Sequence, residues 1–228
     1  MSRSDAACRL AGAADVRAVP LTLVWFLAAL LPAGCGDDLP PDVAGDIPAR
    51  CNPLGGIACL MPWPSAVYLT PDDTATGVRV NLPVEAMPRN TLGVVVDPSP
   101  FNRFDGFSPS GAMLAVFPGG VSAGSLPPHQ DPARSLPDET PGGTEPATVI
   151  LDMSTGKRVL HFAEVDRNAV LPEERALIIR PLERLAPATR YAVAILDSVK
   201  AEDGSDLPVS PAFAALVAGD KGAIASVG

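Results

Sequence analysis

Prolines are spread along the whole chain and confine regular secondary structure to short segments. The 228 residues include 26 prolines and 20 glycines. In a helix interior a proline costs about 3 kcal/mol and a glycine about 1 kcal/mol relative to alanine, which excludes a helical bundle or a coiled coil. Since 47% of the residues are hydrophobic, the chain also differs from a disordered one. Composition therefore favours short strands joined by many turns.

Seven candidate strands lie in the intervals between prolines, because a central strand needs the amide hydrogen that proline lacks. These intervals are 77–82, 92–97, 112–117, 147–152, 158–162, 176–180 and 190–196. A turn at 152–157 predicts a hairpin between the fourth and fifth of them. The proline- and glycine-rich tract 118–146 is interpreted as a long surface excursion. Together these features predict an all-β fold, a β-sandwich in preference to an α/β sheet.

The first 34 residues have the organisation of a secretory signal peptide. Arg3, Arg9 and Arg17 precede an apolar run at 21–31, and small residues follow it. That run is too short for a bilayer core of about 30 Å but fits the central part of a signal. We therefore expect the chain to be exported.

Residues 31–35 (Leu-Pro-Ala-Gly-Cys) resemble the lipobox of bacterial lipoproteins, in which the cysteine receives diacylglycerol and becomes the mature first residue. Pro32 departs from that motif, which usually has Leu, Val or Ile there. Ordinary cleavage nearby, with Cys35 left as a free thiol or a disulfide partner, is the alternative. We expect lipidation of Cys35, anchorage to a membrane, and a polar tether over residues 35–50.

The remaining cysteines divide between the leader and the mature chain. Cys8 lies in the leader, so Cys51 and Cys59 are left as one pair. In an oxidising compartment we expect them to form a disulfide that contributes about 2 to 3 kcal/mol. A zinc site is the competing idea, but it lacks a second cysteine pair, and His129 and His161 are distant in sequence. We expect no metal and no cofactor.

A spaced motif near the end of the chain predicts the type of sandwich. Leu185, Pro187 and Thr189 occupy alternate positions before Tyr191. This pattern resembles the L-x-P-x-T-x-Y corner of immunoglobulin-like and fibronectin-type domains, where the tyrosine hydroxyl bonds back to the backbone at the entrance to a late strand. The alternative is an amphipathic strand that happens to begin with tyrosine.

Several segments together are similar to the N-terminal region of bacterial secreted lipases and related α/β-hydrolase lipoproteins. They are residues 59–65, 89–90, 101–109 and 180–182, with the Tyr191 corner. The similarity runs from about 51 to 214. It implies that residues 51–228 form an immunoglobulin-like accessory domain, which in such proteins precedes the hydrolase domain. It places no catalytic residue in this chain.

One motif of hydrolases is nevertheless present. Residues 120–124 match G-x-S-x-G around Ser122, and Asp131 or Asp138 followed by His161 would give the order Ser, Asp, His. The nucleophile motif needs a helix after its turn, whereas two prolines follow at 127–128. His161 lies in an alternating stretch typical of a structural histidine. We expect this chain to be no enzyme, although a longer protein could carry a hydrolase domain.

Charge and acidic clusters suggest no other chemistry. The net charge is −9 and the basic residues are scattered, which excludes nucleic acid as a partner. Paired acidic residues are interpreted as solvated surface groups, and none has the spacing of a calcium loop. They are Asp72 and Asp73, Glu164 and Asp166, Glu173 and Glu174, and Asp203 and Asp206.

The end of the chain predicts a short helix. Ser210 is a suitable cap and Pro211 a suitable first residue, with Phe213, Leu216 and Val217 on one face. In the family that the chain resembles, a final strand completes the sandwich after such a helix and the hydrolase domain follows. We expect neither here, and therefore expect a sandwich truncated at its C-terminus, with an unpaired strand edge.

Two functions agree with these features. The first is a membrane-anchored lipoprotein of the bacterial cell envelope, a non-catalytic accessory domain whose partner is a hydrolase domain outside this chain. The alternative is an independent cell-envelope binding or adhesion lipoprotein.

Overall fold

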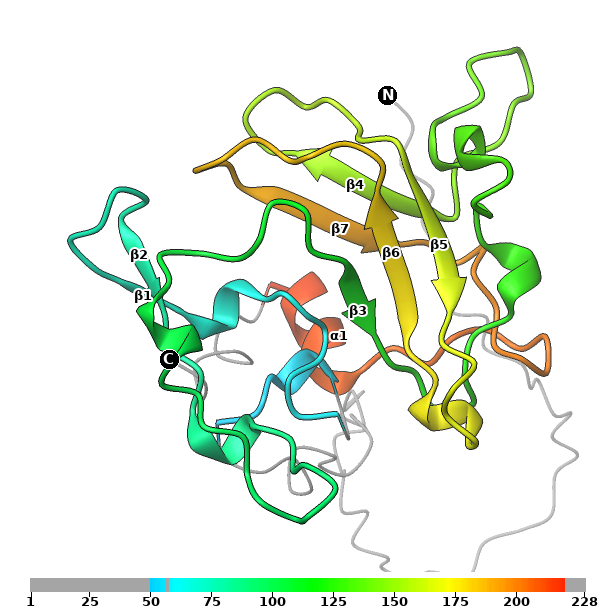
Figure 1. Ribbon diagram of the computed structural model, residues 1–228. Coiled ribbons are helices and arrows are strands. Elements are labelled where there is room, and N and C mark those ends of the chain that lie inside the picture. The colour runs from blue at the N-terminus through cyan, green and yellow to red at the C-terminus, as the bar shows by residue number, and fades with distance from the viewer. Residues whose placement is uncertain (1–49, 56–57, 220–228) are drawn as a thin grey trace, which may run out of the picture. The chain divides into compact units, whose positions relative to one another are not determined.

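The computed structural model describes residues 50–55 and 58–219, which form a β-rich fold with one short helix (Figure 1). The predicted signal peptide, the lipidation site Cys35 and residues 220–228 lie outside this range. The elements are β1 (Leu69–Pro71), β2 (Val78–Val80), β3 (Met113–Ala115), β4 (Thr148–Asp152), β5 (His161–Val165), β6 (Leu177–Pro181), β7 (Tyr191–Ile195) and α1 (Pro211–Val217). Short 3-10 turns lie between them.

The described strands form three antiparallel sheets. One contains β1 and β2, a second has the order β3-β6-β5, and a third pairs β4 with β7. In the second sheet, Ile179 of β6 lies between Met113 of β3 and Ala163 of β5. In the third, Ile150 of β4 pairs with Val193 of β7.

Side chains of the β3-β6-β5 sheet and the β4-β7 sheet, the two larger sheets, share one hydrophobic core. Ile150 of β4 and Leu177 of β6 are completely buried in it, and Tyr191 and Ile195 of β7 pack against it. Burying one such aliphatic side chain contributes about 1.5 to 3 kcal/mol. The first three residues of β4, β5 and β6 alternate between buried and partly buried positions, which explains why these intervals form strands with one inward face.

The proline-rich tract 118–146 is only partly the surface excursion that the sequence predicts. Val121 and Leu126 are buried in the main core. The outer edge of β5 is covered by the same tract, because the N–H of Ala163 donates to Pro127 O (2.8 Å) and that of His161 to Ser135 Oγ (3.0 Å). An edge strand needs such partners, and proline supplies a carbonyl even though it has no N–H.

A second hydrophobic cluster lies in the first part of the domain. Tyr68, Val80 and Leu82 are buried in it. Trp63 packs edge-on against Phe107, with ring centroids 4.9 Å apart, and its backbone N–H donates to Leu114 O of β3 (2.8 Å). Through this bridge the first part of the domain continues the three-stranded sheet.

Strand prediction succeeded for six of the seven intervals, with β5 displaced toward 161–165. The predicted strand at 92–97 is wrong. There the side chain of Asn90 accepts hydrogen bonds from the N–H groups of Leu92 and Val94, which closes a turn instead. Strand β1, which has three residues and ends at Pro71, was not predicted from the sequence.

The predicted hairpin is also only partly correct. The turn at 152–157 forms, with Gly156 at φ 71° and the N–H of Asp152 bonded to Lys157 O (2.9 Å). However, β4 pairs with β7 and β5 with β6. The chain passes from one sheet to the other after Val159, because β4 and β5 each pair along five residues with a strand other than the neighbour in sequence.

The predicted C-terminal helix is confirmed as α1. Ser210 Oγ accepts a hydrogen bond from the N–H of Phe213 (3.2 Å), and Pro211 is the first residue. Phe213 and Val217 remain 51% and 73% exposed. In the part of the chain that the structure describes, no helix has the length and apolar character needed to cross a bilayer.

Candidate functional site

Ser122 lies in a turn that differs from the nucleophile turn of hydrolases. A 3-10 turn of three residues, Ala123–Ser125, follows it, and the chain is extended again at Leu126. Gly120 has φ 70°, and a Cβ there would lie 3.0 Å from Pro172 O, so this turn itself requires glycine. The first glycine of the G-x-S-x-G pattern therefore has a structural explanation, and a 3-10 turn stands where a hydrolase has the α-helix that presents its serine.

His161 is buried between the larger sheets and both of its ring nitrogens are bonded. Nδ1 donates to Val159 O (2.8 Å), which leaves Nε2 to accept from Thr148 Oγ1 (2.8 Å). Burial lowers the pKa of His161, so the ring is neutral at pH 7. Its hydrogen bonds match the structural role that the sequence predicts.

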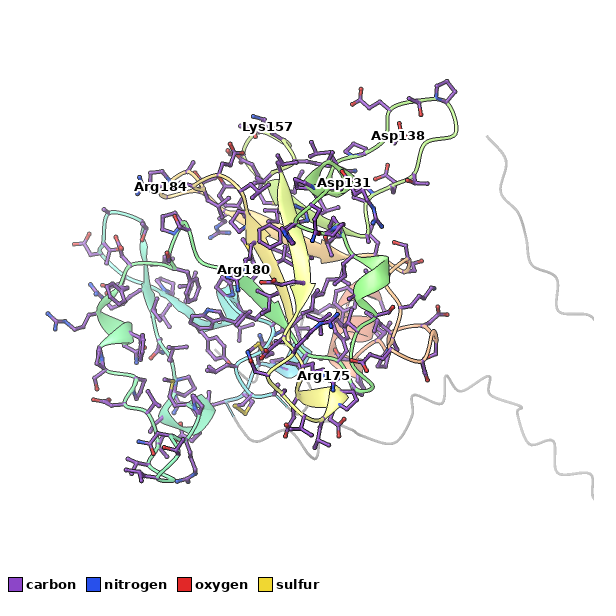
Figure 2. The ribbon with its side chains drawn as sticks, turned by 45° about the vertical axis from the view of Figure 1, so that its right-hand side comes forward. Asp131, Asp138, Lys157, Arg175, Arg180 and Arg184 are labelled. Carbon is purple, nitrogen blue, oxygen red and sulfur yellow. A yellow bond between two sulfur atoms is a disulfide. The ribbon has the colours of Figure 1, made fainter. Side chains whose placement is uncertain are left out.

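The two aspartates predicted as candidates for a triad, Asp131 and Asp138, form no hydrogen bond with Ser122 or His161 among the described residues. Asp138 Oδ1 accepts hydrogen bonds from the N–H (3.0 Å) and hydroxyl (2.7 Å) of Thr140, and the hydroxyl bond lowers the pKa of Asp138 most. Figure 2 shows Asp131 and Asp138 at the end of the domain opposite to Arg175. Arg175 and Ser122 line the same hollow. Among the described residues, no hydrogen bond joins Ser122 Oγ to a histidine or a carboxylate.

That hollow has a volume of about 420 Å³, and one arginine connects the segments that form its wall. Arg175 Nη1 donates to both carboxylate oxygens of Glu202 (2.8 and 3.1 Å), while Nη2 donates to Val170 O (2.9 Å) and Nε to Ala169 O (3.2 Å). The arginine therefore ties the 169–175 turn to the loop that carries Glu202. Arg175 thus has a structural role at this hollow, because its Nε, Nη1 and Nη2 atoms all donate to groups of the protein.

A second hollow, of about 450 Å³, adjoins the first on the outer face of β5 and β6. Glu164 and Arg180 line it and form an ion pair (2.6 Å), and the exposed His129 lies at its side. Both pair members are about half exposed, so the pair contributes little to stability. The linings of the two hollows combine side chains of both charges with apolar ones such as Val165 and Ile178.

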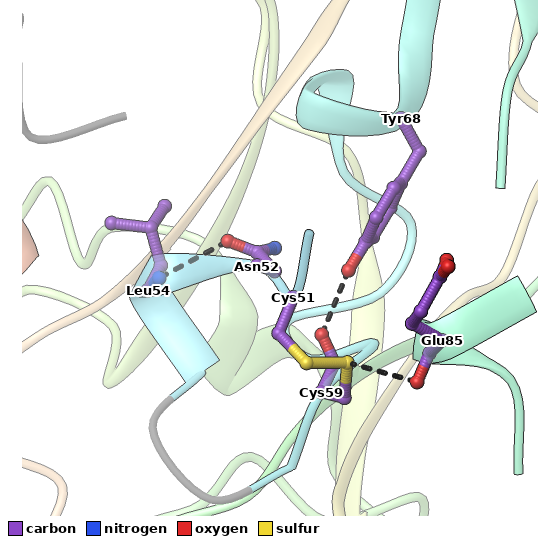
Figure 3. The surroundings of a disulfide bond; sticks show 6 residues. All are labelled: Cys51, Asn52, Leu54, Cys59, Tyr68 and Glu85. Carbon is purple, nitrogen blue, oxygen red and sulfur yellow. Dashed lines mark hydrogen bonds between the residues drawn. A yellow bond between two sulfur atoms is a disulfide. The ribbon is translucent and has the colours of Figure 1, made fainter. Parts of the chain in front are cut away.

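The predicted disulfide between Cys51 and Cys59 is present (Figure 3). Cys51 is buried, and Tyr68 Oη donates to Cys59 O (2.7 Å). Asn52, also buried, donates its side-chain amide to Pro62 O (3.3 Å), and its side-chain oxygen accepts from Leu54 N–H (3.1 Å). Sequence reasoning missed this supporting role of Asn52 and Tyr68.

The four positions of the tyrosine motif come together at the start of β7. The N–H of Ala186 donates to Tyr191 Oη (2.9 Å), and Thr189 Oγ1 donates to Pro187 O (3.0 Å). Leu185 is buried in the main core. Ala188 turns the chain with φ 52°, a conformation that is uncommon for a residue other than glycine. The tyrosine hydroxyl thus bonds back to the backbone, as the spacing predicts.

The remaining acidic residues have local partners or lie in surface turns. A repeated device, which sequence reasoning missed, is Asp followed two residues later by Ser or Thr, whose N–H and hydroxyl both bond the carboxylate. It occurs at Asp97, Asp138, Asp152 and Asp203.

Four other acidic groups from the sequence analysis lie in ion pairs or in a turn. Asp206 pairs with Lys200 and Asp72 with Arg79, whereas Glu173 and Glu174 lie in a 3-10 turn. Within the described ranges, no three His, Cys, Asp or Glu side chains gather in a way that could hold a metal.

Comparisons of the chain with protein-family models, with curated proteins and with solved structures found no match. Function is therefore inferred from the residues and their geometry.

Proposed function

We propose that this chain is an exported, lipid-anchored lipoprotein whose immunoglobulin-like β-sandwich is a non-catalytic accessory domain of a secreted hydrolase. The observation that carries the proposal is the hydrogen bond from Ala186 N–H to Tyr191 Oη at the start of β7. In immunoglobulin-like domains a tyrosine in this position fixes the corner that leads into strand F.

The order of the strands supports the immunoglobulin-like assignment. If β7 is strand F, the preceding strands β3, β4, β5 and β6 become B, C, D and E. The sheets are then B-E-D and C-F, which agree with the A-B-E-D and C-F-G sheets of a constant-type domain. The bridge between Trp63 and Leu114 of β3 stands where strand A would pair with B.

The hydrogen bonds of His161 support a non-catalytic role. A general base needs a free ring nitrogen beside its nucleophile, whereas Nδ1 and Nε2 of His161 are bonded to Val159 and Thr148. The test is hydrolysis of short- and long-chain p-nitrophenyl esters by the full chain, by Ser122→Ala and by the matched variant Ser125→Ala. We expect the same background rate from all three. Activity that only Ser122→Ala abolishes would refute the non-catalytic assignment.

Lipid anchoring rests on the sequence around Cys35 and has its own test. Cells that express the full chain are fed an alkyne-tagged fatty acid, and the protein is examined for incorporated label. We expect the label in the wild type and in Cys8→Ala, and its loss in Cys35→Ala. Label that persists in Cys35→Ala would argue for export without an anchor at this cysteine.

The alternative, an independent envelope-binding module, is favoured by the exposed apolar side chains in the first part of the domain. They include Val84, Leu92, Val94 and Phe104, and exposed apolar side chains can contact a partner. Cross-linking in the native host with a photoreactive residue at Leu92 separates the two functions. Adducts with an α/β-hydrolase support the accessory role, and adducts with other envelope components support the alternative.

A further inference from the structure

Among residues 50–55 and 58–219, nothing pairs with the outer edge of β7, whereas the other outer edges of the two larger sheets are covered. Met153 N–H bonds to Arg190 O (3.0 Å) and Leu196 N–H to Ala147 O (2.9 Å), which fixes the residues at 190 and 196 as hydrogen-bonded partners of β4. Because these groups alternate along an antiparallel strand, the N–H and C=O groups of Tyr191, Val193 and Ile195 point away from β4. Among the described residues, none accepts or donates a hydrogen bond to them.

The other edges show how this fold normally protects a strand. The outer edge of β4 bonds to the segment 157–159, that of β5 to the 118–146 tract, and that of β3 to Trp63. Edge strands are also commonly protected by a charged residue or a proline. The sequence of β7, Tyr-Ala-Val-Ala-Ile, contains neither.

A side chain on this strand is also left without cover. Tyr191 and Ile195 face the main core, and Val193 lies between them on the same face because side chains alternate along a strand. Val193 is nevertheless 42% exposed, and the adjacent Ala194, on the opposite face, is exposed as well. The open backbone edge and the uncovered valine coincide at one residue.

We propose that β7 pairs with the β7 strand of a second copy of this chain. The strand is complementary to itself in an antiparallel arrangement with a two-fold axis at Val193. Val193 would then face Val193 of the second copy, and Tyr191 would face its Ile195, so that all three open residues form hydrogen-bonded pairs. No charged side chain is buried, and both exposed valines are covered. The product is a continuous β4-β7-β7-β4 sheet across two subunits.

The register makes a sharp prediction for cysteine cross-linking. In a hydrogen-bonded antiparallel pair the Cα atoms are about 5.5 Å apart, within the range that a disulfide spans. The two copies of residue 194 would not face each other. Because they are offset along the strands, their Cα atoms would be about 8 Å apart, beyond that range. Two variants of the full chain are therefore compared, both with Cys8→Ser and Cys35→Ser to remove other thiols. One carries Val193→Cys and the control carries Ala194→Cys, and both are oxidised.

We expect a disulfide-linked dimer from Val193→Cys, which reduction removes, and none from Ala194→Cys. Equal cross-linking at both positions would indicate non-specific association and would overturn the proposal. Because both substituted residues are exposed and the background lacks Cys35, the result does not depend on the lipid anchor or on any hydrolase.

Sedimentation of the unmodified chain in detergent gives a second, independent measurement. We expect a concentration-dependent dimer whose dissociation constant rises about tenfold or more in Val193→Lys, since like charges would then lie opposite each other. Circular dichroism checks that the variant is folded. A wild type that stays monomeric at all concentrations, with amides of Tyr191, Val193 and Ile195 that exchange freely, would overturn the proposal. Protection of those amides in a monomer would also overturn it and would assign the edge to another strand of the same chain.

Discussion

Thr148 and His161 join the two larger sheets through a buried hydrogen bond of 2.8 Å between Thr148 Oγ1 and His161 Nε2. Thr148 begins β4, His161 begins β5, and both side chains are fully buried. Strands on different sheets are otherwise held together here by apolar packing, which is not directional. This polar contact therefore helps to fix how one sheet is placed on the other.

Replacing Thr148 with valine should destabilise the domain. Valine has nearly the shape of threonine but leaves Nε2 of His161 buried without a partner, at a cost of about 1 to 3 kcal/mol. Urea unfolding followed by circular dichroism measures the change. The control is Thr144→Val on the exposed loop, for which we expect a change within about 0.5 kcal/mol. Equal effects of the two substitutions would show that the buried bond is unimportant.

Stability should fall as the solution becomes mildly acidic. Burial holds the pKa of His161 below its ordinary value of 6.5, so the unfolded chain takes up a proton at a higher pH than the folded one. The contribution of the neutral ring is complete above about pH 6.5 and is lost as the pH falls through the lowered pKa of the folded state. Urea unfolding at intervals from pH 7.5 to 5 measures this slope.

His161→Asn is the matched comparison for that titration, because it removes the titrating ring but keeps a polar side chain. We expect the variant to be less stable at every pH and to show a flatter pH dependence between 6.5 and 5. A slope equal to that of the wild type would assign the effect to other groups.

Tyr191→Phe should weaken the corner that leads into β7. The substitution keeps the ring but removes the acceptor of the Ala186 N–H, and losing one such hydrogen bond costs about 0.5 to 1.5 kcal/mol. Thr189→Val, which removes an exposed bond to Pro187 O, should cost less. Chemical denaturation measures both, and amide exchange at Ala186 reports the local change. An unchanged exchange rate in Tyr191→Phe would contradict the role of the hydroxyl.

The strands were predictable where local sequence determines them. Between prolines, the alternating residues of β4 and β6 have no competing structure, and Leu185 to Tyr191 have a spacing that depends on a single turn. The segment 92–97 failed because the side chain of Asn90 competes for the backbone N–H groups that a strand needs. Such competition depends on one side-chain conformation, which alternation does not reveal.

Partners distant in sequence were not predictable in the same way. His161 was recognised as structural, but its partners Thr148 and Ser135 are ordinary hydroxyl residues whose importance depends on the packing of two sheets and a proline-rich tract. In the predicted hairpin, residues 157–159 do bond to β4, but the full-length partner of β4 is β7, and β5 pairs with β6. Turn chemistry identifies where the chain reverses, but it does not identify the sheet that the next strand joins.

Removing the disulfide should destabilise the first part of the domain more than the main core. The bond closes a short loop between Cys51 and Cys59, and the chain-entropy model gives about 2 to 3 kcal/mol for it. In a Cys51→Ala, Cys59→Ala double variant we expect faster amide exchange at Tyr68 and Val80, which belong to the nearby cluster, than at Ile150 and Leu177. The wild type in reducing agent should behave like the double variant, and reducing agent should not change the double variant further. Equal acceleration at all four amides would show that the two clusters unfold as one unit.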